Sequence, residues 1–85
     1  MAGVTNLSPG RPYDLRATTV EGKAEETDVS FPGVETTDTV AFVLSVKNGK
    51  TTDRTAEAAI TAPGKVQFSA DTTGERLHIV VYTPH

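Results

Sequence analysis

β-Branched residues and regularly spaced turn residues constrain this chain more than any other feature of its sequence. Valine occurs ten times and leucine four times, and threonine is abundant throughout. β-Branched side chains favour strands over helices because their χ1 rotamers are restricted and fit the pleated surface of a sheet. Seven glycines and five prolines are spread along the chain and supply frequent turns. The sequence therefore predicts short strands joined by turns.

Alternation of apolar and polar residues locates these strands in five segments of the chain, at 13–20, 27–31, 39–46, 65–70 and 76–83. A period of two residues is typical of a strand with one buried face. In segment 39–46 both faces are apolar, which indicates a central strand covered on both sides for part of its length. The side chains expected to be mostly buried are Leu15, Val29, Phe31, Phe42, Leu44, Phe68, Leu77, Ile79 and Val81.

Turn residues between the segments predict how the strands connect. Asn48-Gly49 after a strand is a strong signal for a type I′ hairpin, which needs positive φ at two consecutive residues. Pro63-Gly64 fits the central positions of a type II turn. The polar segment 71–75 contains a glycine and is long enough to close a hairpin. Residues 52–60 fit either a strand or a single helical turn.

The spacing of strands and turns predicts an all-β domain, either a β-sandwich or a small β-barrel of about six to seven short antiparallel strands. The domain is expected to span residues 13–85. Residues 1–12 include Pro9, Gly10 and Pro12 and are expected to form an extended N-terminal arm, since proline removes amide donors and fixes φ. A chain of 85 residues corresponds to one domain, and we find no internal repeat.

Composition excludes several classes of protein. The chain has no cysteine, so it has neither disulfides nor thiolate metal ligands, and a small domain without such links often gains support from partners. Its net charge is −3 and no basic patch is apparent, which argues against nucleic-acid binding. No apolar run is long enough to span a membrane, and the N-terminus lacks the features of a secretory signal. We expect a stand-alone chain made in a bacterial cytoplasm.

The sequence offers no constellation typical of catalysis, of cofactor binding or of a metal site. His78 stands alone within a strand and His85 is the last residue. The acidic run 25–28 lacks the spaced oxygen ligands and turn glycine of a calcium loop. Asp71 is expected to cap its own loop through its side chain. The segment "APGK" at 62–65 is not a phosphate-binding loop. A non-enzymatic role is therefore expected, with no catalytic, cofactor-binding or metal residues.

Three segments resemble small proteins encoded beside the major capsid protein of tailed bacteriophages. They are "DTVAFVLSV" at 38–46, "ITAPGKV" at 60–66 and "DTTGERLHIVVY" at 71–82. The resemblance extends over residues 38–83, about half of the chain. It implies a capsid decoration, or cement, protein that binds the outer surface of the capsid and stabilises it, commonly as a trimer with a β-sandwich or β-barrel body. The implied partners are the phage major capsid protein and two further copies of the chain, and the implied location is the virion surface.

Five residues are the expected contacts with the capsid or with neighbouring subunits. Val4 and Leu7 are apolar residues of the arm, and Arg11 suits a carboxylate partner. Val80 and Tyr82 lie on the opposite face of the last strand from the predicted core. The alternative function is a non-enzymatic immunoglobulin-like or carbohydrate-binding module of a phage fibre or a secreted protein.

Overall fold

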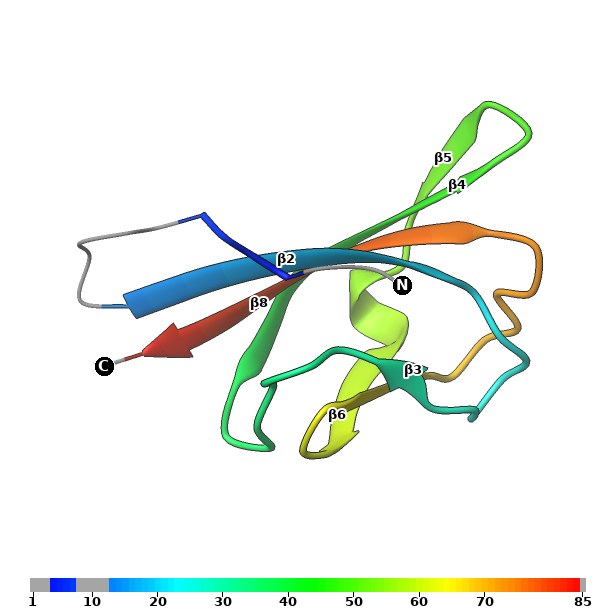
Figure 1. Ribbon diagram of the computed structural model, residues 1–85. Helices are drawn as coiled ribbons and strands as arrows, with labels where there is room; N and C mark the ends of the chain where they lie inside the picture. Colours follow the sequence, from blue (N-terminus) through cyan, green and yellow to red (C-terminus); the bar gives the residue numbers. More distant parts are fainter. Residues whose placement is uncertain (1–3, 8–12, 85) are drawn as a thin grey trace.

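The computed structural model describes residues 4–7 and 13–84 of the chain, and Figure 1 shows their arrangement. The described residues are almost entirely strand, and they form two antiparallel sheets. The predicted all-β class is therefore confirmed, in a sandwich-like arrangement. The strands are β1 (Thr5–Asn6), β2 (Tyr13–Glu21), β3 (Val29–Ser30), β4 (Thr39–Lys47), β5 (Lys50–Asp53), β6 (Ala58–Ala62), β7 (Lys65–Phe68) and β8 (Arg76–Pro84).

The large sheet has the strand order β1-β2-β8-β4-β5, and the small sheet has the order β3-β7-β6. The three long strands of the large sheet, β2, β8 and β4, have nine residues each. The last strand of the chain, β8, lies at the centre of this sheet and pairs with β2 along its whole length. In Figure 1 the small sheet and its connecting loops lie on one side of the large sheet. We call the side of the large sheet that faces the small sheet its inner face, and the other side its outer face.

The core fills the space between the inner face and the small sheet. β8 contributes every second side chain to it, and β4 contributes Val43. These side chains pack against apolar residues of β3, β7 and the loop after β3. The buried hydrophobic residues are Val29, Phe31, Val34, Val43, Val66, Phe68, Leu77, Ile79 and Val81. Burial is therefore confirmed for the predicted core residues Val29, Phe31, Phe68, Leu77, Ile79 and Val81.

The prediction that Phe42 and Leu44 are buried is wrong, and a β-bulge in β4 is the reason. Val40 pairs with Val81, but the register then shifts and Phe42 pairs with Val80. The extra residue in the bulge reverses which side chains point inward. Phe42 is 43% exposed as a result, and Leu44 is only partly buried.

Leu15 was also expected in the core, but it is only partly buried. It lies opposite Tyr82 in the β2–β8 pair, and directly opposed residues of an antiparallel pair share a face. Tyr82 alternates with the buried Val81, so Leu15 and Tyr82 both lie on the outer face. The inner face of β2 instead carries Arg16, Thr18 and Val20.

The predicted turns are mostly confirmed. Asn48 and Gly49 have φ of 53° and 77°, which is the left-handed geometry that a type I′ turn requires between β4 and β5. Gly64 has φ of 77° in the turn between β6 and β7. Residues 52–60 contain both of the expected alternatives, because β5 is followed by a 3-10 turn, η1 (Thr55–Glu57), and then by β6.

Segment 71–75 does not close a hairpin, contrary to the prediction. It carries the chain from β7 in the small sheet to β8 at the centre of the large sheet. Thr73 N–H donates to the Asp71 carboxylate at 2.9 Å, so the expected cap within this loop is confirmed. The loop is held to the 22–27 connection through Thr72, whose N–H donates to the carbonyl oxygen of Lys23 at 2.9 Å.

Candidate binding surface

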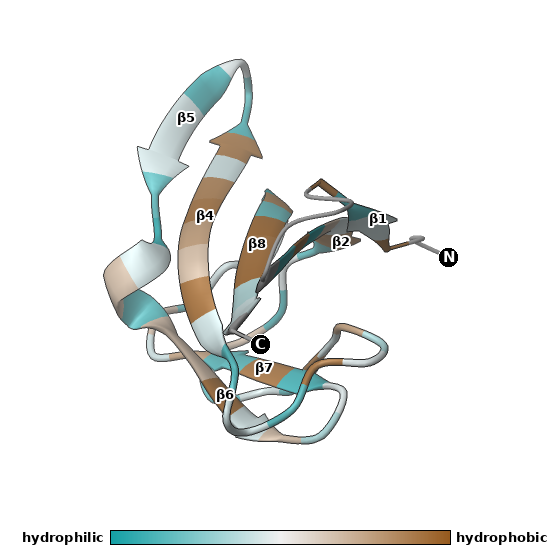
Figure 2. Ribbon diagram, turned by 90° about the vertical axis from the view of Figure 1, so that its left-hand side faces the viewer, coloured by the Kyte–Doolittle hydropathy of each residue, from teal (hydrophilic) through white to brown (hydrophobic). Residues whose placement is uncertain are grey.

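The outer face of the large sheet is the main exposed apolar surface among the described residues. Phe42 is 43% exposed and Tyr82 is 36% exposed, and both lie on this face. Figure 2 shows that β4 and β8, which cross the middle of the sheet, are mostly apolar. The side chains of the three long strands on this face are Leu15, Ala17, Thr19, Phe42, Leu44, Val46, His78, Val80 and Tyr82. We call this set the outer patch.

The strand register orders the outer patch in rows across the sheet. Ala17, Val80 and Phe42 form one row, because Ala17 pairs with Val80 and Val80 pairs with Phe42. Each row therefore runs from a small side chain on β2 to a bulky one on β4. The next row repeats this gradient, from Thr19 through His78 to Leu44. The patch is consequently recessed along β2 and raised along β4.

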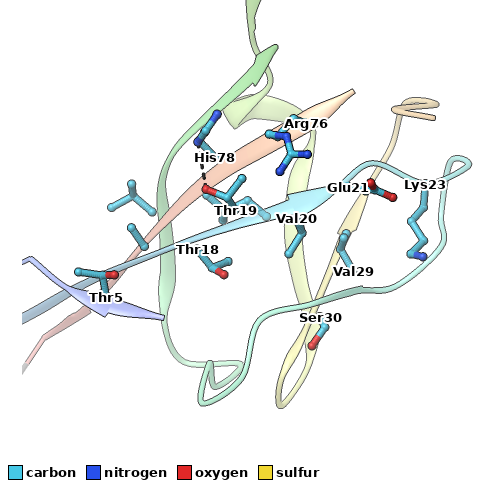
Figure 3. A pocket seen from close by; sticks show the side chains of 13 residues that line it. Thr5, Thr18, Thr19, Val20, Glu21, Lys23, Val29, Ser30, Arg76 and His78 are labelled. Carbon is cyan, nitrogen blue, oxygen red and sulfur yellow. Dashed lines mark hydrogen bonds between the residues drawn. The ribbon is translucent and has the colours of Figure 1, made fainter. Parts of the chain in front are cut away.

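Polar groups within the patch already have partners inside the chain. The Thr19 hydroxyl and the His78 Nδ1 atom are hydrogen bonded at 3.1 Å (Figure 3). At one end of the patch Glu21 and Arg76 lie directly opposite one another on β2 and β8, so opposite charges are paired across the sheet. Burial of this surface by a partner would thus leave the central pair hydrogen bonded, which keeps the desolvation cost low.

A buried ionic network supports the end of the sheet where the β4–β5 hairpin projects. Glu75 accepts hydrogen bonds from the Ser45 hydroxyl and from two nitrogens of Arg54, at 3.2 and 2.9 Å from Oε1 and Oε2. Arg54 also donates to Glu57 at 2.9 Å. Burial alone would raise the pKa of Glu75, but the Ser45 hydroxyl and the Arg54 guanidinium outweigh it and hold the pKa below its usual value. The hydrogen bond to Glu75 in turn raises the pKa of Arg54.

A second ion pair fastens the loop after β3 to the other end of the sheet. The Arg16 guanidinium, on the inner face of β2, donates to the Asp38 carboxylate and to the Thr83 hydroxyl, both at 2.9 Å. It also donates to the carbonyl oxygen of Gly33 at 3.0 Å. Asp38 is 8% exposed and accepts a further bond from the Glu35 N–H at 2.9 Å. Both ends of the large sheet are therefore held in a defined shape behind the outer patch.

A groove of about 750 Å³ runs along the β2 side of the molecule, next to β3 (Figure 3). Its lining includes hydroxyl groups and the charged residues Glu21, Lys23 and Arg76. The hydroxyl-bearing residues of the lining are Thr5, Thr18, Thr19 and Ser30. His78 and Val80 belong to both the groove and the outer patch, so the groove borders the patch along β2.

The structure brings together three of the five residues predicted as contacts. Val80 and Tyr82 lie on the outer face, and Leu7 extends that face because its N–H donates to the carbonyl oxygen of Leu15. Leu7 is 53% exposed. Val4 instead packs against the core cluster. Arg11 lies outside the described residues.

Sequence reasoning missed the β4 part of the patch, namely Phe42, Leu44 and Val46. Alternation could not assign these residues, because Ala41 and Val43 are apolar on the other side of the same strand. Ser45, the polar residue of this stretch, suggested the opposite assignment. It is in fact buried, at 2% exposure, where its hydroxyl donates to Glu75.

Comparisons with known proteins leave the chain without a relative. No family model matches it, and neither the curated proteins nor the solved structures contain a significant match. In the part of the chain that the structure describes, no helix is long and apolar enough to cross a membrane. Residues 4–7 and 13–84 also contain no group of three or more histidine, aspartate or glutamate side chains placed to hold a metal ion.

Proposed function

We propose that this chain is a structural virion protein that binds the outer surface of a tailed-phage capsid and stabilises it, assembled as a trimer. The observation that carries the proposal is the outer patch, an apolar sheet face on a small and rigid body. Contiguous exposed apolar surfaces of this kind mark sites of protein–protein contact. The sequence resemblance to capsid decoration proteins supplies the class of partner, the major capsid protein.

The energetics of a small domain agree with such a role. A domain of this size buries only about 60–65% of the surface of its unfolded chain, so its own stability is modest. Binding to the folded form alone adds stability by mass action. Many copies on one particle also bind by avidity, so that each contact can be weak. A decoration protein therefore needs an apolar contact surface and a defined shape, and this chain has both.

Binding to capsids tests the proposal directly. The purified chain would be mixed with capsids assembled from the major capsid protein encoded nearest to its gene, and bound protein would be measured by co-sedimentation. We expect saturable binding to the intact chain and a loss of roughly tenfold or more for Phe42→Ser, which corresponds to about 1.4 kcal/mol. Thr61→Ser, on the exposed side of β6, is the matched control and should bind like the parent. Absence of the intact chain from the capsid pellet at all concentrations would refute the proposal.

The groove beside β2 favours a second candidate function, that of a carbohydrate-binding module. Its hydroxyl groups and charged side chains could hydrogen bond to a sugar. None of the residues that line it is aromatic, however, so the groove lacks the ring on which a sugar could stack. A glycan array probed with the labelled chain separates the two candidates, since selective binding that is lost in Ser30→Val and Lys23→Ala would support the module.

A further inference from the structure

We propose that the outer patch is the surface through which copies of this chain bind one another, with β4 of one copy lying against β2 of the next. The inference rests on the proposed function, because a decoration protein acts as an assembly of copies, and it names a second copy as the occupant of the patch. The argument uses the exposure, the shape, the charge and the area of the patch.

The patch has no cover within the described part of the chain. The small sheet, the 3-10 turn and the loops tied to Arg16 and Thr72 all pack at the inner face or at the sheet ends. Phe42 is therefore left 43% exposed beside the apolar Val80. Burying a side chain of this size stabilises a complex by roughly 1.5–3 kcal/mol.

Shape selects a second copy over an arbitrary partner. The rows of the patch run from Ala17 and Thr19 on β2 to Phe42 and Leu44 on β4. The raised β4 side of one copy therefore fits the recessed β2 side of another, and the two surfaces are complementary without any rearrangement. This contact joins different halves of the patch, so it can close a pair around a twofold axis or a ring of three around a threefold axis.

Charge permits the same contact. The rows at the centre of the patch contain no acidic residue and no Lys or Arg, and the polar pair there, Thr19 and His78, is hydrogen bonded within its own chain. Glu21 and Arg76 oppose one another at the end of the patch. Two copies can thus approach without bringing a net charge of one sign into the contact, although each chain carries a net charge of −3.

The area of the face is sufficient for a specific contact. Three strands of nine residues, together with the shorter β1 and β5, cover about 500 Å² at roughly 3.3 Å per residue and 4.8 Å between strands. Two such faces bury about 1,000 Å² in total, which is near the lower bound for a specific protein–protein interface. We therefore expect an association of moderate strength that strengthens when many copies gather on one particle.

Sedimentation equilibrium of the purified chain, without capsids, tests self-association. We expect the intact chain to associate as its concentration rises, and Phe42→Ser and Val80→Asp to shift the midpoint to concentrations at least about tenfold higher. The control Thr61→Asp places a charge on the exposed side of the small sheet and should associate like the parent. Circular dichroism melting at low concentration checks that the variants remain folded. A monomer at all concentrations would overturn the inference.

Cysteine cross-linking tests the geometry, and the absence of native cysteine makes it clean. Thr19→Cys and Leu44→Cys chains would be mixed and oxidised, and the rate of mixed disulfide formation measured on a non-reducing gel. We expect this pair to cross-link on the order of tenfold faster than Thr19→Cys mixed with Lys65→Cys, because the contact raises the effective concentration. Faster linking of Leu44→Cys to itself would overturn the β4-to-β2 arrangement.

The two sets of experiments separate the inference from the proposed function. A chain that associates through the patch but does not bind capsids would retain the inference and refute the capsid role. A chain that binds capsids as a monomer, with Phe42→Ser binding weakened, would retain the capsid role and refute the inference, because the patch would then face the capsid itself.

Discussion

The two faces of the large sheet are formed by the same strands, yet they carry different functions. On the inner face β8 buries Leu77, Ile79 and Val81 completely against the small sheet. On the outer face the same strand presents His78, Val80 and Tyr82, of which Tyr82 is 36% exposed. Both faces are apolar at their centres, so hydrophobicity alone does not distinguish a core from a binding surface. What distinguishes them is which face the short strands β3, β6 and β7 cover.

This difference teaches that parity along a strand decides role in a small sandwich. In β4 a single bulge between Val40 and Phe42 reverses the parity, so Val40 and Val43 point to the inner side while Phe42 points outward. Without the bulge, Phe42 would point inward with Val40. The predictions below compare substitutions on the two faces, beginning with the largest expected effect.

The largest contrast is expected between two phenylalanines. Phe68 is 2% exposed in the core, whereas Phe42 is 43% exposed on the outer face. Phe68→Ala should lower the free energy of unfolding by about 3–5 kcal/mol, because it leaves a cavity. Phe42→Ala should lower it by less than about 1 kcal/mol, as for most surface substitutions. Urea unfolding at low protein concentration measures both, and equal losses would show that the outer patch belongs to the core.

Much of the fold could be predicted from the sequence, because its signals are local. The strands β2, β4, β7 and β8, the Asn48-Gly49 turn and the Asp71 cap follow from alternation and turn chemistry within a few residues. The pairing of β8 with β2 could not be predicted in this way, since its partners are about sixty residues apart in the chain. The 71–75 loop was taken for a hairpin for the same reason, because a short polar loop can also join two sheets.

The candidate site was only partly predictable. Val80 and Tyr82 were assigned correctly to the second face of β8, because Leu77, Ile79 and Val81 alternate clearly with them. Phe42 and Leu44 were not, because a bulge leaves no sequence signal when the strand is apolar on both sides. The apolar Val4 of the expected arm gave no sign that it packs on the core, since that contact depends on the pairing of β1 with β2.

The second contrast concerns the buried ion pair behind the patch. Glu75→Gln should lower stability at neutral pH by about 2–3 kcal/mol, because charged hydrogen bonds to Ser45 and Arg54 are lost. Its more exposed counterpart Glu57→Gln should cost less than about 1 kcal/mol. The comparison thus extends from apolar to ionic groups, with burial as the deciding quantity.

The pH dependence of the same variant follows from the direction of the shift. The pKa of Glu75 is lowered in the folded chain, so its stabilising effect is complete above the pKa of the unfolded chain, about 4.3 for glutamate. The effect is lost as the pH falls through the lower, folded value. The parent and Glu75→Gln should therefore differ in melting temperature at pH 7 and converge toward pH 3. A gap that persists unchanged to pH 3 would show that the carboxylate charge is not its cause.

A smaller contrast separates neighbouring residues of β4. Val43 is fully buried and Leu44 points to the outer face. Val43→Thr should cost about 1–2 kcal/mol, because it buries a hydroxyl among apolar side chains. Leu44→Thr should cost less than about 1 kcal/mol and should weaken self-association. Thermal unfolding of the two variants beside the parent measures this, and the reverse order would mean that the bulge is misplaced by one residue.

The smallest effect is expected where neither face of the sheet is covered, at the tip of the β4–β5 hairpin. Figure 1 shows this hairpin projecting beyond the small sheet, and residues 47–53 are all exposed. Gly49 has φ of 77°, and a Cβ there would meet no atom within 4 Å, so the cost of Gly49→Ala is conformational and about 1 kcal/mol. Because the tip makes no core contact, this cost should appear as local opening. Amide hydrogen exchange should accelerate in residues 46–51 and stay unchanged at Ile79, with Lys50→Ala as a control that leaves both regions unaffected. Faster exchange at Ile79 would show that the hairpin unfolds together with the core, and that the uncovered tip is energetically coupled to the inner face.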